Sequence, residues 1–172
     1  MLSEKQVSQY QDDGYVIPDF RLDPDVVKEI AEQHTRLLRN YPQFSDYCPA
    51  LLAFDLGFLN FARNDLILDM VSQLIGPDFA LWNCSFFAKP AGTGKQVPWH
   101  QDGEYWPIRP LATCSVWIAI DASTSENGCL EVIPGSHRPG CLLDHETNNS
   151  PDVSLPLQLK PGEIDPGQAV RI

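Results

Sequence analysis

Two side chains that bind metals well lie two positions apart in the stretch VPWHQDGEYWP, residues 97–107. In an extended segment, side chains at positions i and i+2 point to the same side. His100 and Asp102 can therefore converge on one ion, while Gln101 faces the other way. An imidazole nitrogen and a carboxylate oxygen suit Fe(II), Mn(II) or Zn(II), and a second histidine would complete a facial triad that leaves half of the coordination sphere open. An H-x-D triplet alone is a weak signal, because such triplets often occur by chance.

The surroundings of this triplet favour a binding site. The glycine-rich turn AGTGK, residues 91–95, comes before it, so we expect the pair to open a strand at the mouth of a barrel. Trp99, Tyr105 and Trp106 crowd the pair, and aromatic side chains can exclude water and shape a pocket for an organic substrate. Core packing explains Trp99 equally well, and that alternative stays open.

Length and charge narrow the classes of protein to consider. A chain of 172 residues has the length of a single domain with one substantial core. Its 12 Lys and Arg residues form no cluster and are outnumbered by 23 Asp and Glu residues, which argues against nucleic acid and anionic membranes as partners. No apolar run approaches the length of a membrane span, and the polar start MLSEKQVSQYQDDG does not resemble a secretory signal.

The cysteines indicate a reducing environment. They are odd in number and include no C-x-x-C pair, which argues against a disulfide framework or a thiolate zinc site. We therefore expect a cytoplasmic protein with free thiols. The five residues are Cys48, Cys84, Cys114, Cys129 and Cys141.

Residues 1–76 are predicted to be mainly helical, because three apolar-periodic stretches carry capping and terminating residues. These signals are the capping-box pair Ser3 and Gln6 with Gly14 as terminator, the N-cap Asp23 followed by Pro24, and the N-cap Asn64 before a helix from Asp65 to Ile75.

From residue 77 on, short runs rich in β-forming residues alternate with turns rich in Gly and Pro. The runs are FALWNCSFFAK, CSVWIAID, CLEVI, SLPLQL and QAVRI, and their spacing predicts a sandwich or barrel rather than a parallel sheet. We expect one α+β domain, mainly β, in which the helices of residues 1–76 cover an outer face of the strands of residues 77–172.

Two longer tracts carry a resemblance to a known family. They are WHQDGEYWPIRP and, behind it, SVWIAIDASTSENGCLEVIPGSHRPG, and the similarity is densest from Lys89 to Gly140. In this ordered series the chain resembles the phytanoyl-CoA dioxygenase family of Fe(II)/2-oxoglutarate-dependent oxygenases. The resemblance implies a double-stranded β-helix (a cupin-like jelly roll) with helices on one sheet. It also implies a hydroxylase that uses Fe(II), 2-oxoglutarate and O2 on a small-molecule substrate.

The resemblance assigns roles to individual residues. His100 and Asp102 match the first two iron ligands, and the retained carboxylate argues against the halogenating relatives. Trp117 matches a tryptophan beside the 2-oxoglutarate. Asn83 and Ser85 share one face of an alternating run with Phe87 and Lys89, and relatives bind the cosubstrate from that face, so these two residues are candidates for cofactor binding.

Four residues just past the ligands are candidates for substrate contact, with a place in the core or at the rim as the alternative for each. They are Glu104, Tyr105, Trp106 and Arg109.

The third iron ligand is the main departure from the family pattern. The distal histidine and the 2-oxoglutarate-anchoring arginine of the family would follow about one strand pair later, and Arg171 comes too early to be that arginine. Of the other histidines, His34 is expected to pack on its helix, His137 to belong to a structural turn in PGSH, and His145 to lie in a polar loop.

Three interpretations follow. The first, which we favour, is a chain shortened at its C-terminus, so that the jelly roll is incomplete and only two of three ligands are present. In the second, His137 or His145 substitutes as the third ligand. In the third, a truncated or vestigial jelly-roll domain has lost catalysis and acts as a binding or interaction module. The composition indicates neither a particular substrate nor an oligomeric state, although the acidic balance favours a small neutral or cationic substrate.

Overall fold

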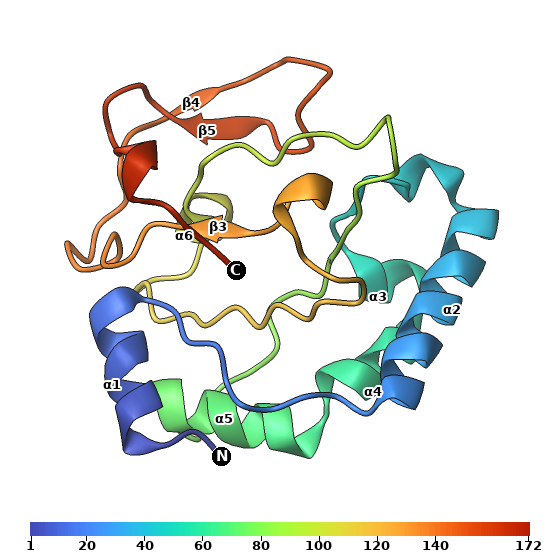
Figure 1. The fold of residues 1–172 in the computed structure, drawn as a ribbon, viewed down its shortest axis with the longest axis horizontal. Coiled ribbons are helices and arrows are strands. Elements are labelled where there is room, and N and C mark those ends of the chain that lie inside the picture. The colour runs from blue at the N-terminus through green and yellow to red at the C-terminus, as the bar shows by residue number, and fades with distance from the viewer.

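The computed structural model describes all of residues 1–172 and shows helices followed by short strands (Figure 1). The helices are α1 Glu4–Asp13, α2 Pro24–Asn40, α3 Leu51–Phe54, α4 Leu59–Ala62, α5 Asp65–Ile75 and α6 Asp102–Tyr105. The strands are β1 Tyr47–Cys48, β2 Phe86–Phe87, β3 Glu131–Val132, β4 His145–Thr147, β5 Leu157–Leu159 and β6 Val170–Arg171. The mixed helix-and-strand composition is therefore confirmed.

The three predicted helices begin and end where their capping residues indicated. The Ser3 hydroxyl accepts a hydrogen bond from the Gln6 amide, and the Gln6 side chain accepts one from the Ser3 amide, which completes a capping box. Gly14 ends α1 with a positive φ of 81°. The side chains of Asp23 and Asn64 cap α2 and α5 in the same way.

The strands form three separate antiparallel pairs rather than the two continuous sheets of a jelly roll. Strand β1 pairs with β2, β3 with β6, and β4 with β5. The run CSVWIAID, predicted as a strand, is not one here, because no backbone–backbone hydrogen bond involves residues 113–121. A strand needs a neighbouring segment to pair with, and its own residue types do not supply one.

Alternate residues of two extended segments pack against the helices. Cys84 and Phe86 contact the core cluster that α2, β1 and α3 build, which includes the fully buried Cys48 and Leu51. Residues of the second segment do the same: Cys114 and Ile118 contact a cluster around α5, and Ile120 contacts the first cluster. The helices therefore pack against one side of these segments.

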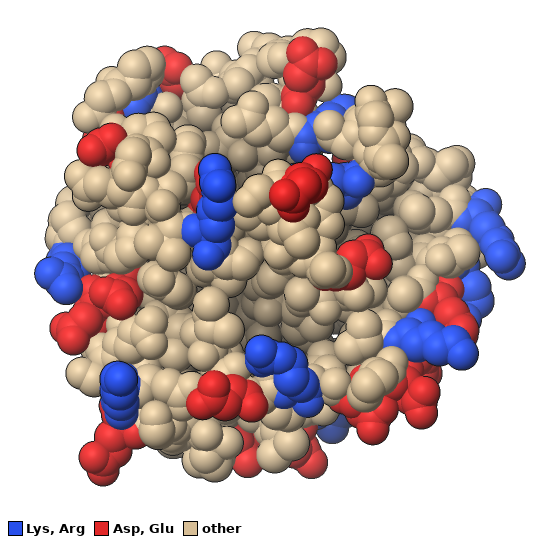
Figure 2. Space-filling view, viewed as in Figure 1, with Lys and Arg blue, Asp and Glu red and all other residues tan.

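The other face of the same segments is exposed, and it carries Asn83, Ser85, Ser115 and Trp117. Trp82 lies two positions before the packed Cys84, but its side chain is 57% exposed, so the packing of this segment begins at Cys84. Figure 2 shows the molecule hollowed near the middle of one face, with acidic and basic side chains scattered around it. None of the helices combines the length and the apolar character that crossing a membrane requires.

His34 packs against the strand segment through its ring. The imidazole stacks on Phe86 at 3.8 Å between ring centres with an interplanar angle of 6°. Its Nε2 atom is buried without a hydrogen-bond partner. Burial lowers the pKa of His34, and the negative charge of Asp121 only partly opposes this effect.

We predict that truncating Leu51 in α3 will destabilise the protein far more than truncating Leu66 in α5. The Leu51 side chain is 1% exposed and the Leu66 side chain is 51% exposed. Leu51→Ala should lower the free energy of unfolding by about 2–5 kcal/mol, and Leu66→Ala by less than about 1 kcal/mol. Urea titration of both variants measures the difference, and equal losses would contradict this description of the core.

His34 should make stability depend on pH. Because folding lowers its pKa, the neutral ring stabilises the fold fully above the ordinary pKa of 6.5, and this contribution is lost as the pH falls through the lower folded-state value. His34→Phe keeps a ring on Phe86 but cannot titrate. Between about pH 7 and about pH 5 the wild type should lose more stability in urea titrations than this variant does. Parallel losses in both proteins would rule out a contribution from His34.

Candidate metal centre

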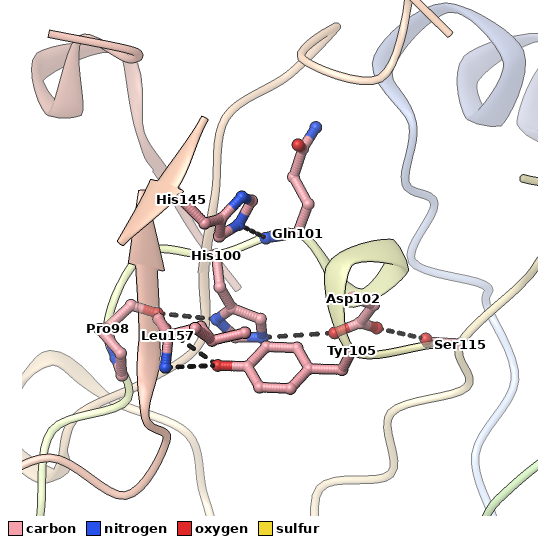
Figure 3. Close-up of polar contacts among 8 residues, drawn as sticks. All are labelled: Pro98, His100, Gln101, Asp102, Tyr105, Ser115, His145 and Leu157. Carbon is pink, nitrogen blue, oxygen red and sulfur yellow. Dashed lines mark hydrogen bonds and ion pairs between the residues drawn. The ribbon is translucent and has the colours of Figure 1, made fainter. Parts of the chain in front are cut away.

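His100 and Asp102 converge as their spacing predicts. His100 Nε2 lies 3.3 Å from Asp102 Oδ1 (Figure 3). Gln101 between them is extended, with φ -113° and ψ 129°, so the two flanking side chains share one side. The strand expected at the pair does not form, because residues 97–101 are in no strand and Asp102 begins the short helix α6.

Hydrogen bonds orient both side chains. His100 Nδ1 donates to the Pro98 carbonyl oxygen at 2.7 Å, and this oxygen can only accept, so Nδ1 carries a proton. Asp102 Oδ2 accepts a hydrogen bond from the Ser115 hydroxyl at 2.7 Å. The two atoms left facing each other are therefore the second imidazole nitrogen and the second carboxylate oxygen.

Two such atoms cannot face each other at 3.3 Å without a positive charge between them, because each offers a lone pair. In the metal-free protein a proton fills this role. Burial lowers the pKa of His100, but the hydrogen bonds to Asp102 and Pro98 outweigh burial and the pKa is raised overall. Burial likewise raises the pKa of Asp102, but the bonds from His100 and Ser115 outweigh it, and that pKa is lowered overall.

The same two atoms fit a divalent metal. Metal–ligand bonds of about 2.1 Å at a right angle put neighbouring donor atoms about 3 Å apart, close to the observed separation. The imidazole is 19% exposed and the carboxylate 46% exposed, so the pair is reachable from the open face. No third His, Cys, Asp or Glu side chain joins the pair, because no group of three such residues in the structure could hold a metal ion.

The other histidines have different partners. His137 Nε2 bonds to the Gln11 carbonyl oxygen at 3.0 Å, and Arg138 Nε donates to the Asp12 carbonyl oxygen at 2.9 Å. The PGSHR tract thus satisfies free carbonyl groups at the end of α1, which agrees with the structural role predicted for it. His145 was expected in a loop. This expectation is wrong, because His145 begins β4 and accepts a hydrogen bond from the Gln101 amide at 3.1 Å.

The residues predicted to bind 2-oxoglutarate are exposed and make no hydrogen bond to His100 or Asp102. Asn83 Nδ2 donates to the Pro49 carbonyl oxygen at 2.8 Å. Ser85 is exposed, and the Trp117 side chain is 48% exposed. Arg171, set aside as too early for the anchoring arginine, pairs with Glu131 at 3.0 Å.

The four candidate substrate residues are placed differently from one another. The Tyr105 hydroxyl donates to the Leu157 carbonyl oxygen at 2.9 Å, and its ring meets His100 edge-on with the ring centres 5.7 Å apart. Arg109 donates to the carbonyl oxygens of Trp106 and Ile108, and its guanidinium is exposed. Glu104 is exposed, and Trp106 is partly buried.

Sequence reasoning missed Ser115 and the contact between Gln101 and His145. Ser115 could have been found, because it is two positions before Trp117 in the alternating run and so shares the face of that residue. The Gln101–His145 hydrogen bond joins residues 44 positions apart, and no local pattern indicates such a contact.

Fold and site together show mixed helix and strand content and a facing His-x-Asp pair that is partly exposed. Residues 10–170 match the family model Phytanoyl-CoA dioxygenase (PhyH), and the chain belongs to this family. Membership implies Fe(II), 2-oxoglutarate and O2 as cofactors, as the resemblance in the sequence suggested.

Individual relatives agree with this assignment. The chain is 28% identical to a probable phytanoyl-CoA dioxygenase of Caenorhabditis elegans, over 85% of this chain and 56% of the relative. It is 38% identical to the human peroxisomal phytanoyl-CoA dioxygenase, over 46% of this chain and 25% of the relative. It is 30% identical to the L-proline trans-4-hydroxylase of Streptomyces griseoviridis, over 70% of this chain and 43% of the relative. The matched part covers from about a quarter to about half the length of these relatives.

We predict that Ser115→Ala will weaken metal binding without unfolding the protein. The variant loses the hydrogen bond that orients the Asp102 carboxylate. Loss of such a supporting bond typically lowers metal affinity by about 10–100-fold. Titration with Mn(II), followed by the electron paramagnetic resonance of the free ion, measures the change. Ser123→Ala is the matched control, because that hydroxyl bonds to the Ile172 carbonyl instead, and equal affinities in the two variants would refute the role of Ser115.

Proposed function

We propose that these residues belong to a non-haem Fe(II)/2-oxoglutarate-dependent dioxygenase that hydroxylates a small organic substrate. The observation that carries the proposal is the facing pair of His100 Nε2 and Asp102 Oδ1, between which a proton or a metal cation can sit. Membership of the phytanoyl-CoA dioxygenase family supports iron as that cation. Relatives named as an L-proline trans-4-hydroxylase and a probable alpha-ketoglutarate-dependent hypophosphite dioxygenase support the cosubstrate and the reaction class.

Four residues of this chain would bind the metal or orient its ligands. His100 and Asp102 would hold the metal, Pro98 would keep the imidazole in the tautomer that presents Nε2, and Ser115 would keep one carboxylate oxygen aimed at the metal. When bound, Fe(II) supplies O2 activation coupled to the oxidative decarboxylation of 2-oxoglutarate.

Other predicted residues complete the proposed site. Asn83, Ser85 and Trp117 would contact 2-oxoglutarate, since all three lie on the exposed face that also bears Ser115. The substrate would be met by residues of α6 and the segment after it. These are Glu104, Tyr105, Trp106 and Arg109.

No third ligating side chain converges on His100 and Asp102. The proposal therefore needs a third iron ligand that comes from another part of the protein. We propose that residues 77–172 form jelly-roll strands and residues 1–76 their helical cover, within a single domain. The alternation of packed and exposed residues along both extended segments supports this arrangement.

A non-catalytic binding or interaction module is the second candidate function. It is favoured by the two-ligand site, which alone would hold iron weakly, and by the exposed indole rings of Trp82 and Trp117. This candidate predicts no iron-dependent turnover.

We further propose a small neutral or cationic substrate and a cytoplasmic location. The net charge of -11 disfavours a polyanionic substrate. All five cysteines are unpaired, as in a reducing compartment.

The deciding experiment measures Fe(II)-dependent consumption of 2-oxoglutarate by the full-length protein. His100→Ala and Asp102→Asn should each abolish consumption and reduce Mn(II) affinity at least about tenfold, because either change removes a metal ligand. Asp144→Asn is the matched control, since that exposed carboxylate pairs with Lys160 and should be dispensable.

Either of two outcomes would overturn the proposal. Full turnover in His100→Ala would show that this residue holds no essential iron. Absence of iron-dependent consumption in a wild type that binds Mn(II) would favour the binding module instead.

A further inference from the structure

The hairpin β4–β5 holds the metal-binding segment before, between and after its two ligands. Before them, the Leu159 amide donates to the Trp99 carbonyl oxygen at 2.8 Å. After them, the Tyr105 hydroxyl bridges the carbonyl and amide groups of Leu157 at 2.9 Å and 3.1 Å. Between them, Gln101 bonds to the start of β4. The hairpin therefore holds the backbone that carries His100 and Asp102 through hydrogen bonds on both sides of the pair and between its members.

The contact at Gln101 consists of two hydrogen bonds that run in opposite directions. The Gln101 amide donates to His145 Nε2 at 3.1 Å, and the Gln101 side-chain oxygen accepts from the Leu143 amide at 2.7 Å. In Figure 3 the Gln101 side chain points away from the contact between His100 and Asp102. Gln101 thus faces the hairpin while its neighbours face the metal site.

These partners determine the protonation of His145. A backbone amide can only donate, so Nε2 bears no proton. The Leu143 carbonyl oxygen can only accept, so Nδ1, at 2.8 Å from it, bears one. Both ring nitrogens of His145 are therefore occupied, and its Nε2 lone pair is engaged by an amide rather than free for a metal.

The amide that His145 accepts from belongs to the peptide bond joining His100 to Gln101. Fixing the direction of this group restricts ψ of His100 and φ of Gln101, the two torsions on either side of that bond. The extended backbone at Gln101, φ -113° and ψ 129°, is what puts the imidazole and the carboxylate on one side. A rotated peptide would turn them apart.

We propose that His145 is a positioning residue of the metal site: through the hydrogen bond that its Nε2 accepts, it holds the 100–101 peptide so that His100 and Asp102 face one ion. This inference rests on the proposed function for the identity of the site, but the geometry that it describes exists without a metal. It also replaces the idea that His145 is the third ligand.

Three variants test the proposal. His145→Phe keeps the ring and removes the lone pair, whereas His145→Gln offers an amide oxygen that can accept the same hydrogen bond. Thr147→Val is the control, because its side chain lies on the same strand without a hydrogen bond of its own. The measurements are hydrogen exchange of the Gln101 amide, nitrogen-15 shifts of the imidazoles, and Mn(II) affinity.

We expect wild-type His145 to show a protonated Nδ1 and an unprotonated Nε2. His145→Phe should speed exchange of the Gln101 amide, shift the His100 ring signals, and lower Mn(II) affinity by about tenfold or more. His145→Gln should restore most of each property, and Thr147→Val should match the wild type.

Unchanged His100 signals and unchanged Gln101 exchange in a folded His145→Phe would overturn the proposal. If that variant does not fold, a protonated Nε2 in wild-type His145 would overturn it just as directly. A wild type that fails to bind Mn(II) would instead count against the proposed function, while the metal-free spectra still decide the role of His145.

Discussion

The two-sided character of the extended segments is the constraint on which the structure depends. Packed and exposed side chains alternate along residues 83–87 and 117–120, so that Cys84, Phe86 and Ile118 pack on the helices while Ser85 and Trp117 stay exposed. Val116 interrupts the pattern before residue 117, because its side chain is 50% exposed. The same alternation that directs some side chains into the core leaves the others exposed, where they can contact ligands. Ser115 shows the link directly, because it follows the packed Cys114 and reaches Asp102 from the opposite side of the chain.

The candidate metal site is defined by two lone-pair atoms, His100 Nε2 and Asp102 Oδ1, that lie 3.3 Å apart. His100 Nδ1 donates a hydrogen bond to the Pro98 carbonyl oxygen, and the Ser115 hydroxyl donates one to Asp102 Oδ2. The remaining nitrogen and oxygen therefore face each other with lone pairs. A proton satisfies them in the metal-free protein, and a metal ion would have to displace it. In our proposal the pair is a preformed cation site, and hydrogen bonds from the hairpin behind it hold the intervening residue Gln101.

Sequence patterns were sufficient where the determining interactions are local. The helix ends follow from capping side chains within three residues, and the convergence of His100 with Asp102 follows from the period of an extended segment. These patterns failed where contact with a distant segment determines the local structure. Residues 113–121 have the composition of a strand but no backbone partner, and His145 is fixed by an amide 44 positions away, so its place on a strand beside Gln101 could not be read from its polar neighbours.

The closure of α1 by the PGSHR tract joins parts of the chain that are 126 residues apart. The ribosome makes α1 before this tract, and the carbonyl groups of Gln11, Asp12 and Asp13 find their partners only on residues 135–138. Until that tract has left the exit tunnel, water must solvate the end of this helix. A helix frays most easily at such an end. The end of α1 is therefore secured only after the PGSHR tract has been translated, and until then it remains accessible to chaperones.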